Sequence, residues 1–344
     1  MTWRPSILIG LFVATSLNAQ QPKNVKILVG MSRPEVQRVM NQMRAGLGVH
    51  CHYCHVTGQD ASVDGTPQKA KAREMMRMVI DLNQRNFGGR EMVTCFTCHN
   101  GTPHPKFAPP LPQKLPPDLP ANPPVAEAKN LPKASEVLQR YVAAVGRIVP
   151  AAEPRTIIAT RATPLGGPVA MKVLESGENW RVDITLPDGT PVTQVLAAAG
   201  GWVRDKSGVR DMSSEELAGA RMGRRPFAPF TESNFGDDAT VTTDKIGDQN
   251  VWVVTTADAQ YSFDTETGLL LRRIVFYSSP MGRIPEQTEF DHYRSVGGAK
   301  VPFTTRVALV DPWLGGSRQA TTIVIGTPIP QAEFERPSSP PALK

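Results

Sequence analysis

With 344 residues the chain is long enough for two domains. Its formal net charge of +6 is unevenly distributed: residues 20–133 hold 15 lysines and arginines against eight acidic residues, whereas residues 134–344 hold 22 against 24. Aromatic residues make up only 6% of the chain. Together with the export signal described next, so few stacking side chains argue against a nucleic-acid-binding protein.

Residues 1–19 have the pattern of a secretory signal peptide. Arg4 is its basic residue, and residues 7–13 form an apolar stretch of only seven residues, far shorter than the roughly 20 that a membrane span needs. Ala19 is the expected cleavage point. We therefore expect an exported, periplasmic protein, with an uncleaved N-terminal membrane anchor as the alternative.

A helix is expected over residues 33–47. Ser32 is a typical N-cap, and Glu35 three residues later completes a capping box. Two glycines, Gly46 and Gly48, are expected to end the helix. Apolar residues recur at helical spacing and predict one buried face, made of Val36, Val39, Met40, Met43 and Leu47.

All four cysteines lie in two Cys-x-x-Cys-His motifs, Cys51-His52-Tyr53-Cys54-His55 and Cys95-Phe96-Thr97-Cys98-His99. This arrangement is typical of covalent c-type haem attachment. Both thiols can form thioethers to the porphyrin, and the adjacent histidine can bind the iron. The sequence therefore predicts two covalently bound haem c groups, held by Cys51, Cys54, Cys95 and Cys98, with His55 and His99 as axial iron ligands.

Three other uses of four cysteines explain less. A four-thiolate zinc site usually has its cysteine pairs much closer than the about 40 residues found here. A dithiol redox motif explains one pair and not two. Disulfides are compatible with export. All three uses leave the histidine after each pair without a role.

A second helix is expected from Pro67 to the pair Gly88-Gly89, with Thr66 as its cap. It places Met75 and Met78 on one face, at the same spacing as Met40 and Met43 on the first helix. The sequence thus repeats one unit, a methionine-bearing helix followed by a haem motif.

The second axial ligand of each iron has two candidate sources. Thioether sulfur raises the haem potential and suits an electron carrier, which points to Met40 or Met43 for the first haem and Met75 or Met78 for the second. Methionine on an apolar helix face is otherwise ordinary core packing. Bis-histidine ligation would instead draw on His50, His52, His104 or His292.

This region resembles the cytochrome c subunit of the photosynthetic reaction centre. The resemblance covers about residues 28–105 and lies in three stretches, residues 40–55, 71–83 and 93–99. In that family a methionine on the helix before the haem motif is the sixth iron ligand. Carried over by position, the resemblance implies Met40 and Met75 as ligands, with Met43 and Met78 as the fallback.

The chain departs from the family pattern in three ways. The reaction-centre subunit carries four haems, whereas no cysteine follows Cys98 here, so two can be attached. Gly88-Gly89 occupies the region where the family has a histidine ligand for a fourth haem. Asn100 stands where arginine commonly follows the haem histidine. The resemblance implies electron transfer without requiring a photosynthetic host.

Residues 103–133 are expected to form a linker, because eleven prolines fall between Pro103 and Pro132 and favour extended, semi-rigid geometry. A helix capped by Ser135 and running to about Arg147 should follow. Short strands are then expected, separated by turn signals, over residues 155–162, 169–174, 180–186, 251–256, 269–277 and 301–309.

The leading helix, the strand-rich pattern and the stretches 261–270 and 290–294 give residues 134–330 a resemblance to the periplasmic lipoprotein-carrier (LolA-like) fold. That resemblance implies a curved antiparallel sheet, or half-barrel, with an apolar concavity. An apolar ligand such as a lipid or quinone is the implied partner. A module used only for docking or spacing is the simpler alternative.

We therefore expect a multidomain protein with an all-α dihaem cytochrome domain (20–102), a Pro-rich linker (103–133), an α+β half-barrel (134–330) and a disordered tail (331–344). The expected function is electron transfer, without enzyme activity, and a dihaem peroxidase is the alternative. The basic surplus of residues 20–133 offsets the four propionates of two haems. It also suits an acidic or membrane-associated redox partner protein.

Overall fold

The computed structural model describes residues 22–105 and 131–337, except 151, 164–165, 199, 214–215, 218–219, 221–234, 237 and 311–314. The expected signal peptide and linker residues 106–130 lie outside this range. In the described residues, no helix combines the length and the apolar character needed to cross a membrane.

The N-terminal region is helical, as predicted. It consists of α1 (Arg33–Leu47), a short 3-10 helix η1 (Cys51–Tyr53), α2 (Pro67–Phe87) and α3 (Cys95–His99). The backbone N–H of Ser32 donates to the Glu35 carboxylate, 2.6 Å away, as the capping box predicts. The two long helices end at Gly48 and Gly88, which both adopt the left-handed conformation (φ 63° and 60°) that favours glycine.

The rest of the described chain contains the helix α4, one antiparallel sheet and a short 3-10 helix near its end. All six predicted strands are present. Helix α4 spans Ala134–Val145. The strands are β1 (Arg155–Thr163), β2 (Gly166–Ser176), β3 (Asn179–Thr185), β4 (Pro191–Ala197), β5 (Gly200–Asp205), β6 (Gly208–Asp211), β7 (Thr240–Ile246), β8 (Gln249–Thr255), β9 (Ala259–Asp264), β10 (Leu270–Tyr277), β11 (Ile284–Val296), β12 (Ala299–Leu309) and β13 (Gly316–Ile325).

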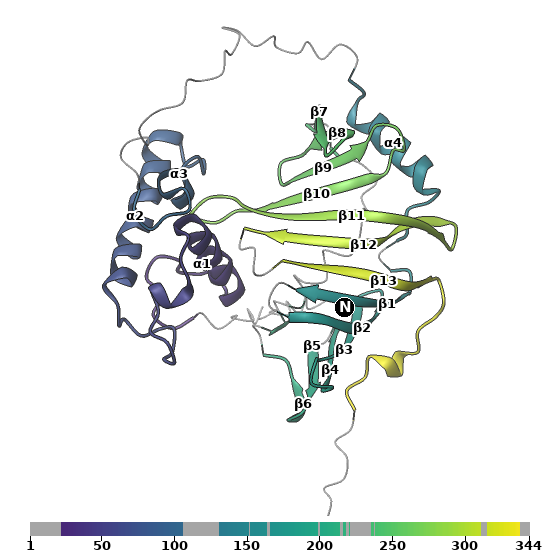
Figure 1. The fold of residues 1–344 in the computed structure, drawn as a ribbon, viewed down its shortest axis with the longest axis horizontal. Coiled ribbons are helices and arrows are strands. Elements are labelled where there is room, and N and C mark those ends of the chain that lie inside the picture. The colour runs from purple at the N-terminus through teal and green to yellow at the C-terminus, as the bar shows by residue number, and fades with distance from the viewer. Residues whose placement is uncertain are drawn as a thin grey trace, which may run out of the picture.

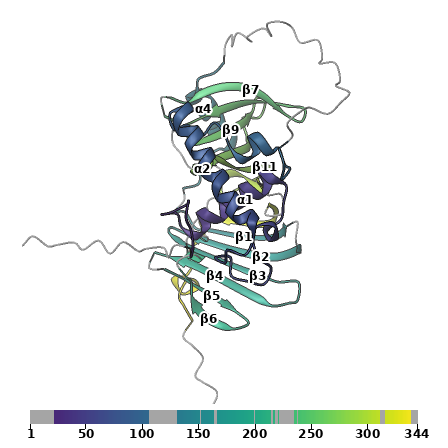
Figure 2. The same ribbon diagram turned by 90° about the vertical axis from the view of Figure 1, so that its left-hand side faces the viewer.

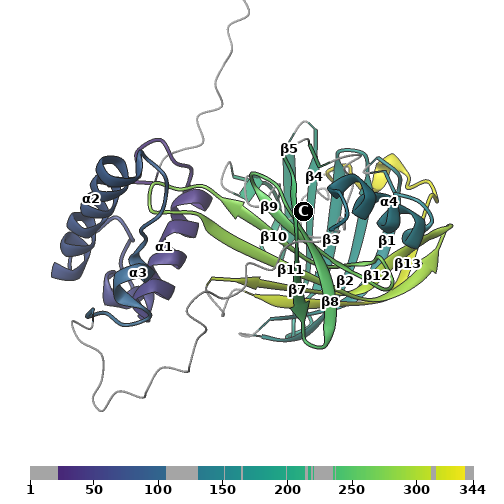
Figure 3. The same cartoon turned by 90° about the horizontal axis from the view of Figure 1, so that it is seen from above.

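The sheet has 13 strands in the order β6-β5-β4-β3-β2-β1-β13-β12-β11-β10-β9-β8-β7. Consecutive strands pair as hairpins, except β6 and β7, which are the two edges of the sheet. Because β1 pairs with β13, the first and last strands meet near the middle (Figure 1). The sheet is strongly curved, and α4 lies against it (Figure 3). Buried side chains of α4 pack on the strands: Val137, Leu138, Tyr141 and Val145.

Two expectations about the ends of this region need correction. The N-cap of α4 is Lys133 and not Ser135, because the Lys133 N–H donates to Glu136 three residues later. The expected tail is not disordered from residue 331. Gln331–Glu333 form a 3-10 helix, and Phe334 is 3% exposed because it packs against Trp202 and strand residues. The burial of Phe334 therefore orders residues 331–334, although the Pro- and Ser-rich composition predicted disorder.

Candidate haem-attachment site

The first haem motif follows α1 directly and is wound into a single turn. The N–H groups of Cys54 and His55 both donate to the carbonyl oxygen of Cys51, over 3.2 and 3.0 Å. The turn therefore places the two thiols and the imidazole close together, as attachment to one porphyrin requires. Burial raises the pKa of the Cys54 thiol.

The second motif forms α3, a helix of five residues capped by Thr94. The His99 ring nitrogen Nδ1 lies 3.0 Å from the carbonyl oxygen of Thr102. In the tautomer that this contact requires, Nδ1 carries the proton and the Nε2 lone pair is available to a metal. This arrangement fits an axial haem ligand. The Nδ1 atom of His55 is buried without a hydrogen-bond partner among the described residues.

The end of α1 packs directly on α3. A Cβ atom on Gly46 would lie 3.1 Å from both Cys95 Cβ and the Phe96 nitrogen, and the Gly101 N–H donates to the Gly46 carbonyl oxygen over 2.9 Å. At Gly48 a Cβ would clash with the Gly101 carbonyl oxygen. We expected these two glycines only to end the helix. Because neither glycine has a side chain, the two Cys-x-x-Cys-His segments can also approach each other closely.

The candidate methionines differ in their surroundings. Met43 is 8% exposed and belongs to a core shared by α1 and α2, while Met40 is half-buried at its edge. On α2, Met75 is half-buried, whereas the side chain of Met78 is 48% exposed. The core position of α2 is taken by Met76, which is 4% exposed and was not among our candidates.

The other histidines are spread over the molecule. His50 and His52 are exposed and stack on each other, with ring centroids 5.6 Å apart. His104 is exposed as well. His292 lies in β11, where its Nδ1 is 2.9 Å from the Thr304 hydroxyl. That position is eight residues into the strand, roughly 26 Å along the sheet from the end nearest the helices.

The two cysteine pairs are also not brought together as a metal cluster. Within the described ranges, no group of three or more His, Cys, Asp or Glu side chains has an arrangement that could hold a metal ion. Each pair instead stays with its own adjacent histidine.

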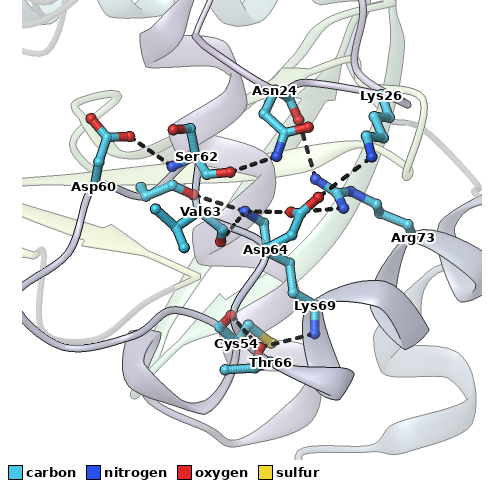
Figure 4. Close-up of polar contacts among 11 residues, drawn as sticks. Asn24, Lys26, Cys54, Asp60, Ser62, Val63, Asp64, Thr66, Lys69 and Arg73 are labelled. Atoms are coloured by element: carbon cyan, nitrogen blue, oxygen red, sulfur yellow. Dashed lines mark hydrogen bonds and ion pairs between the residues drawn. The ribbon is translucent and has the colours of Figure 1, made fainter.

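A polar cluster fixes the loop that connects the first motif to α2 (Figure 4). The Asp64 carboxylate lies 3.0 Å from Lys69 Nζ, 2.9 Å from Arg73 Nη1 and 3.4 Å from Lys26 Nζ. Hydrogen bonds from Arg73, Asn24 and Lys69 lower the pKa of Asp64 well below its ordinary range. The Thr66 hydroxyl donates to the Cys54 carbonyl oxygen over 2.6 Å, which ties the start of α2 to the first motif.

Asn83 holds the segment before the second motif, and our reading of the sequence missed it. Its side chain is 4% exposed; the amide nitrogen donates to the Val93 carbonyl oxygen (2.8 Å), and the amide oxygen accepts from the N–H groups of Met92 (3.1 Å) and Val93 (2.9 Å). An asparagine on the apolar face of a predicted helix was the available signal.

We expect Asn83→Ala to destabilise the helical region by about 2–4 kcal/mol, because three buried backbone groups lose their partner. Asn86→Ala is the matched control, since Asn86 is exposed on the same helix. Urea unfolding followed by helical circular dichroism measures both variants. Equal midpoints for the two variants would contradict the role given to Asn83.

The sheet contains a cavity of about 420 Å³. Its lining is largely apolar and includes Met171, Trp180 and Ile184. The lining also includes Arg318, which is 5% exposed, and burial lowers the pKa of this guanidinium to about 10. A concave space of this kind is compatible with the apolar ligand that we expected for the C-terminal part.

Comparison with known proteins agrees with the resemblance expected for the N-terminal region. Residues 14–115 match the family described as photosynthetic reaction centre cytochrome C subunit. Cytochrome c-554 of Chloroflexus aurantiacus is 43% identical over 88 residues, which are 24% of this chain and 21% of that protein. The photosynthetic reaction center cytochrome c subunit of Thermochromatium tepidum is 36% identical over 90 residues, 25% of this chain and 22% of that one.

Solved structures similar to the chain include a LolA superfamily protein from Nitrosomonas europaea, with 15% identity and a TM-score of 0.38, covering 60% of this chain and 99% of that one. A putative outer membrane lipoprotein-sorting protein domain from Vibrio parahaemolyticus has 12% identity and a TM-score of 0.37, covering 59% and 96%. The chain spans only about a fifth of the length of the curated relatives that it matches. In its N-terminal third, however, it resembles the cytochrome c subunit of the photosynthetic reaction centre, as the two motifs and their methionine helices predicted.

Proposed function

We propose that the protein is a c-type cytochrome that transfers electrons through two covalently attached haems. The observation that supports this proposal most directly is the repeated unit of a methionine-bearing helix followed by Cys-x-x-Cys-His. It occurs with α1 before Cys51–His55 and with α2 before Cys95–His99. The similarity to reaction-centre cytochrome subunits over residues 14–115 points in the same direction.

The residues have separate roles in this proposal. Cys51 and Cys54 hold one porphyrin, and Cys95 and Cys98 hold the other. When bound, each haem supplies a one-electron Fe(III)/Fe(II) couple, which accepts one electron from a donor and passes one to an acceptor. His55 and His99 are the histidine ligands. The Thr102 carbonyl near His99 Nδ1 fixes the tautomer and the orientation of the imidazole ring.

Met40 and Met75 are the proposed second ligands. A thioether sulfur stabilises Fe(II) over Fe(III) and therefore raises the potential. With a histidine and a methionine of the chain holding each iron, no ligand position would be left for a substrate. Such a centre exchanges electrons without other chemistry. This distinguishes it from a dihaem peroxidase, which needs one open or releasable iron position and distal acid–base groups.

Peroxide turnover separates the carrier from the peroxidase. We expect the haem-loaded protein to be low-spin at both irons and to be reduced and reoxidised reversibly. Hydrogen peroxide consumption should not exceed that of a small monohaem carrier with His/Met ligands, measured at the same haem concentration. A high-spin signal in the resting protein together with rapid peroxide consumption would favour the enzyme and contradict the carrier.

The remaining parts of the chain fit an exported redox protein. The signal-like residues 1–19 imply delivery to the periplasm, where bacterial c-type haem is attached. The excess of 15 basic over eight acidic residues in 20–133 would steer an acidic or membrane-associated protein partner toward the haems. The sheet cavity near Trp180 and Arg318 would hold an apolar ligand, such as a lipid or quinone.

A further inference from the structure

The loop between β10 and β11 leaves the sheet and enters the core of the helical region (Figures 1 and 3). This loop comprises residues 278–283. Its Met281 is fully buried, and Ile284 at the start of β11 is 6% exposed. Both pack in one cluster with side chains of α1, α2 and the preceding segment, namely Leu28, Val39, Met43, Met76 and Val79. Residues from the sheet therefore complete the hydrophobic core of the helical region.

Contacts at the base of the loop hold it against α1. The Arg38 guanidinium lies 3.6 Å from the centre of the Tyr277 ring, a close cation–π contact. Burial raises the pKa of the half-buried Glu286 carboxyl, and the positive charge of Arg38 opposes this rise. In Figure 2 the helices α1 and α2 lie in front of β11. The attachment thus combines a cation–π contact with a favourable electrostatic interaction between Arg38 and Glu286.

The loop has a fixed shape of its own. The Ser279 hydroxyl donates to the Gly282 carbonyl oxygen over 2.7 Å and accepts from the Met281 N–H over 3.2 Å. Both hydrogen bonds are buried, so water does not compete for their donors and acceptors. The loop therefore presents Met281 and Gly282 to the helices in one defined arrangement.

Gly282 touches the residue that caps the second haem-attachment helix. Its φ of +113° is in the range that side chains rarely adopt, and a Cβ there would lie 2.5 Å from Thr94 Cγ2. Thr94 is the N-cap of α3 and directly precedes Cys95, which itself borders the shared core. The loop tip therefore lies against the start of the second motif.

We propose that residues 278–283 position the second haem site, with Gly282 acting through Thr94. This inference rests on the proposed attachment of haem at Cys95 and Cys98. A helix of five residues is far shorter than the about 12 at which isolated helices become even marginally stable. Its orientation depends on what packs around it. The loop sets that orientation together with Gly46 and Asn83, and α3 carries His99.

The test compares two glycine variants in haem-loaded protein. Gly282→Ala adds a methyl group against Thr94 Cγ2, whereas Gly208→Ala adds one at a position with the same φ of +113° and no atom within 4 Å. Both variants place a side chain at the same unfavourable φ. We expect Gly282→Ala to shift the midpoint potential and the low-spin spectrum of the second haem and to leave the first unchanged. Gly208→Ala should leave both unchanged.

Thr94→Ser tests the contact itself, because it removes the Cγ2 methyl group and keeps the capping hydroxyl. The double variant Gly282→Ala/Thr94→Ser should return the second haem toward the potential of the Thr94→Ser protein. Ser279→Ala is an independent variant that loosens the loop without adding an atom near α3. It should change the second haem alone.

The number of covalent haems per chain tests the proposed function separately from the positioning role of residues 278–283. A variant lacking Cys51 and Cys54 identifies the signal of the second haem. Fewer than two covalent haems in the unmodified protein would contradict the proposed function. With two haems present, unchanged potentials in both Gly282→Ala and Ser279→Ala would overturn the positioning role. Equal shifts in Gly208→Ala and Gly282→Ala, or no recovery in the double variant, would also overturn it.

Discussion

Replacing Met40 or Met75 with alanine is expected to lower the midpoint potential of one haem and to let carbon monoxide bind that iron. The loss of a thioether ligand removes the preference for Fe(II). We expect a drop on the order of 0.2 V, within the roughly 0.8 V range over which axial ligands set haem potentials. Spectroelectrochemical titration measures the potential, and the reduced-minus-CO spectrum measures the open iron.

The neighbouring methionines are the controls. Met78 is 48% exposed, so Met78→Ala should change neither potential. Met43 lies in the core, so Met43→Ala should reduce stability by about 2–5 kcal/mol without opening an iron to carbon monoxide. If carbon monoxide binds the Met43 or Met78 variant and not the Met40 or Met75 variant, the ligand assignment is wrong.

Replacing both Cys95 and Cys98 with alanine is expected to leave a protein with one covalent haem. Each thioether pair belongs to its own motif, and each motif keeps its histidine on the same turn or helix. Intact mass and the alkaline pyridine spectrum measure haem per chain. Cys51→Ala with Cys54→Ala is the matched variant, and it should lose the other haem.

The helical region should also become less stable when the second haem is lost, because α3 packs on the end of α1 through Gly46. Two haems retained in the Cys95/Cys98 variant would show that these thiols do not carry the second one. A protein that loses both haems in either variant would contradict independent attachment.

Local sequence signals predicted the helices of the N-terminal region and six of the 13 strands. Ser32 with Glu35, and Thr66 with Pro67, define helix starts through contacts within four residues, and Gly48 and Gly88 define the ends through their left-handed conformation. The strands follow from alternating apolar residues and turn signals. Such features depend on near neighbours in the chain, so the sequence alone contains the information.

Long-range contacts could not be predicted in this way. Nothing near Met281 indicates that a turn between two strands packs against Val39 and Met76, more than 200 residues away. Gly46 was expected only to end a helix. Its close approach to Cys95 depends on how α1 packs on α3, which the local sequence does not show. Phe334 lies in a composition typical of a disordered tail, and only its packing beside Trp202 orders it.

The residues of the candidate site also fall into those that local sequence predicts and those that depend on long-range contacts. The cysteines and histidines were predicted by spacing, because attachment chemistry fixes their separation in the chain. The choice among Met40, Met43, Met75 and Met78 depends on which side chains the core takes up, and spacing does not determine that. Asn83 was missed because its three partners lie nine and ten residues away, beyond the range of helix periodicity.

The most direct test of the central claim is the number of covalent haems in the full chain, produced with the c-type haem attachment machinery. The intact mass after denaturation is predicted to exceed that of the polypeptide by two haems, and the alkaline pyridine spectrum should have the single sharp band typical of two thioether bonds per haem. A mass equal to the polypeptide alone, or to the polypeptide with one haem, would contradict the account.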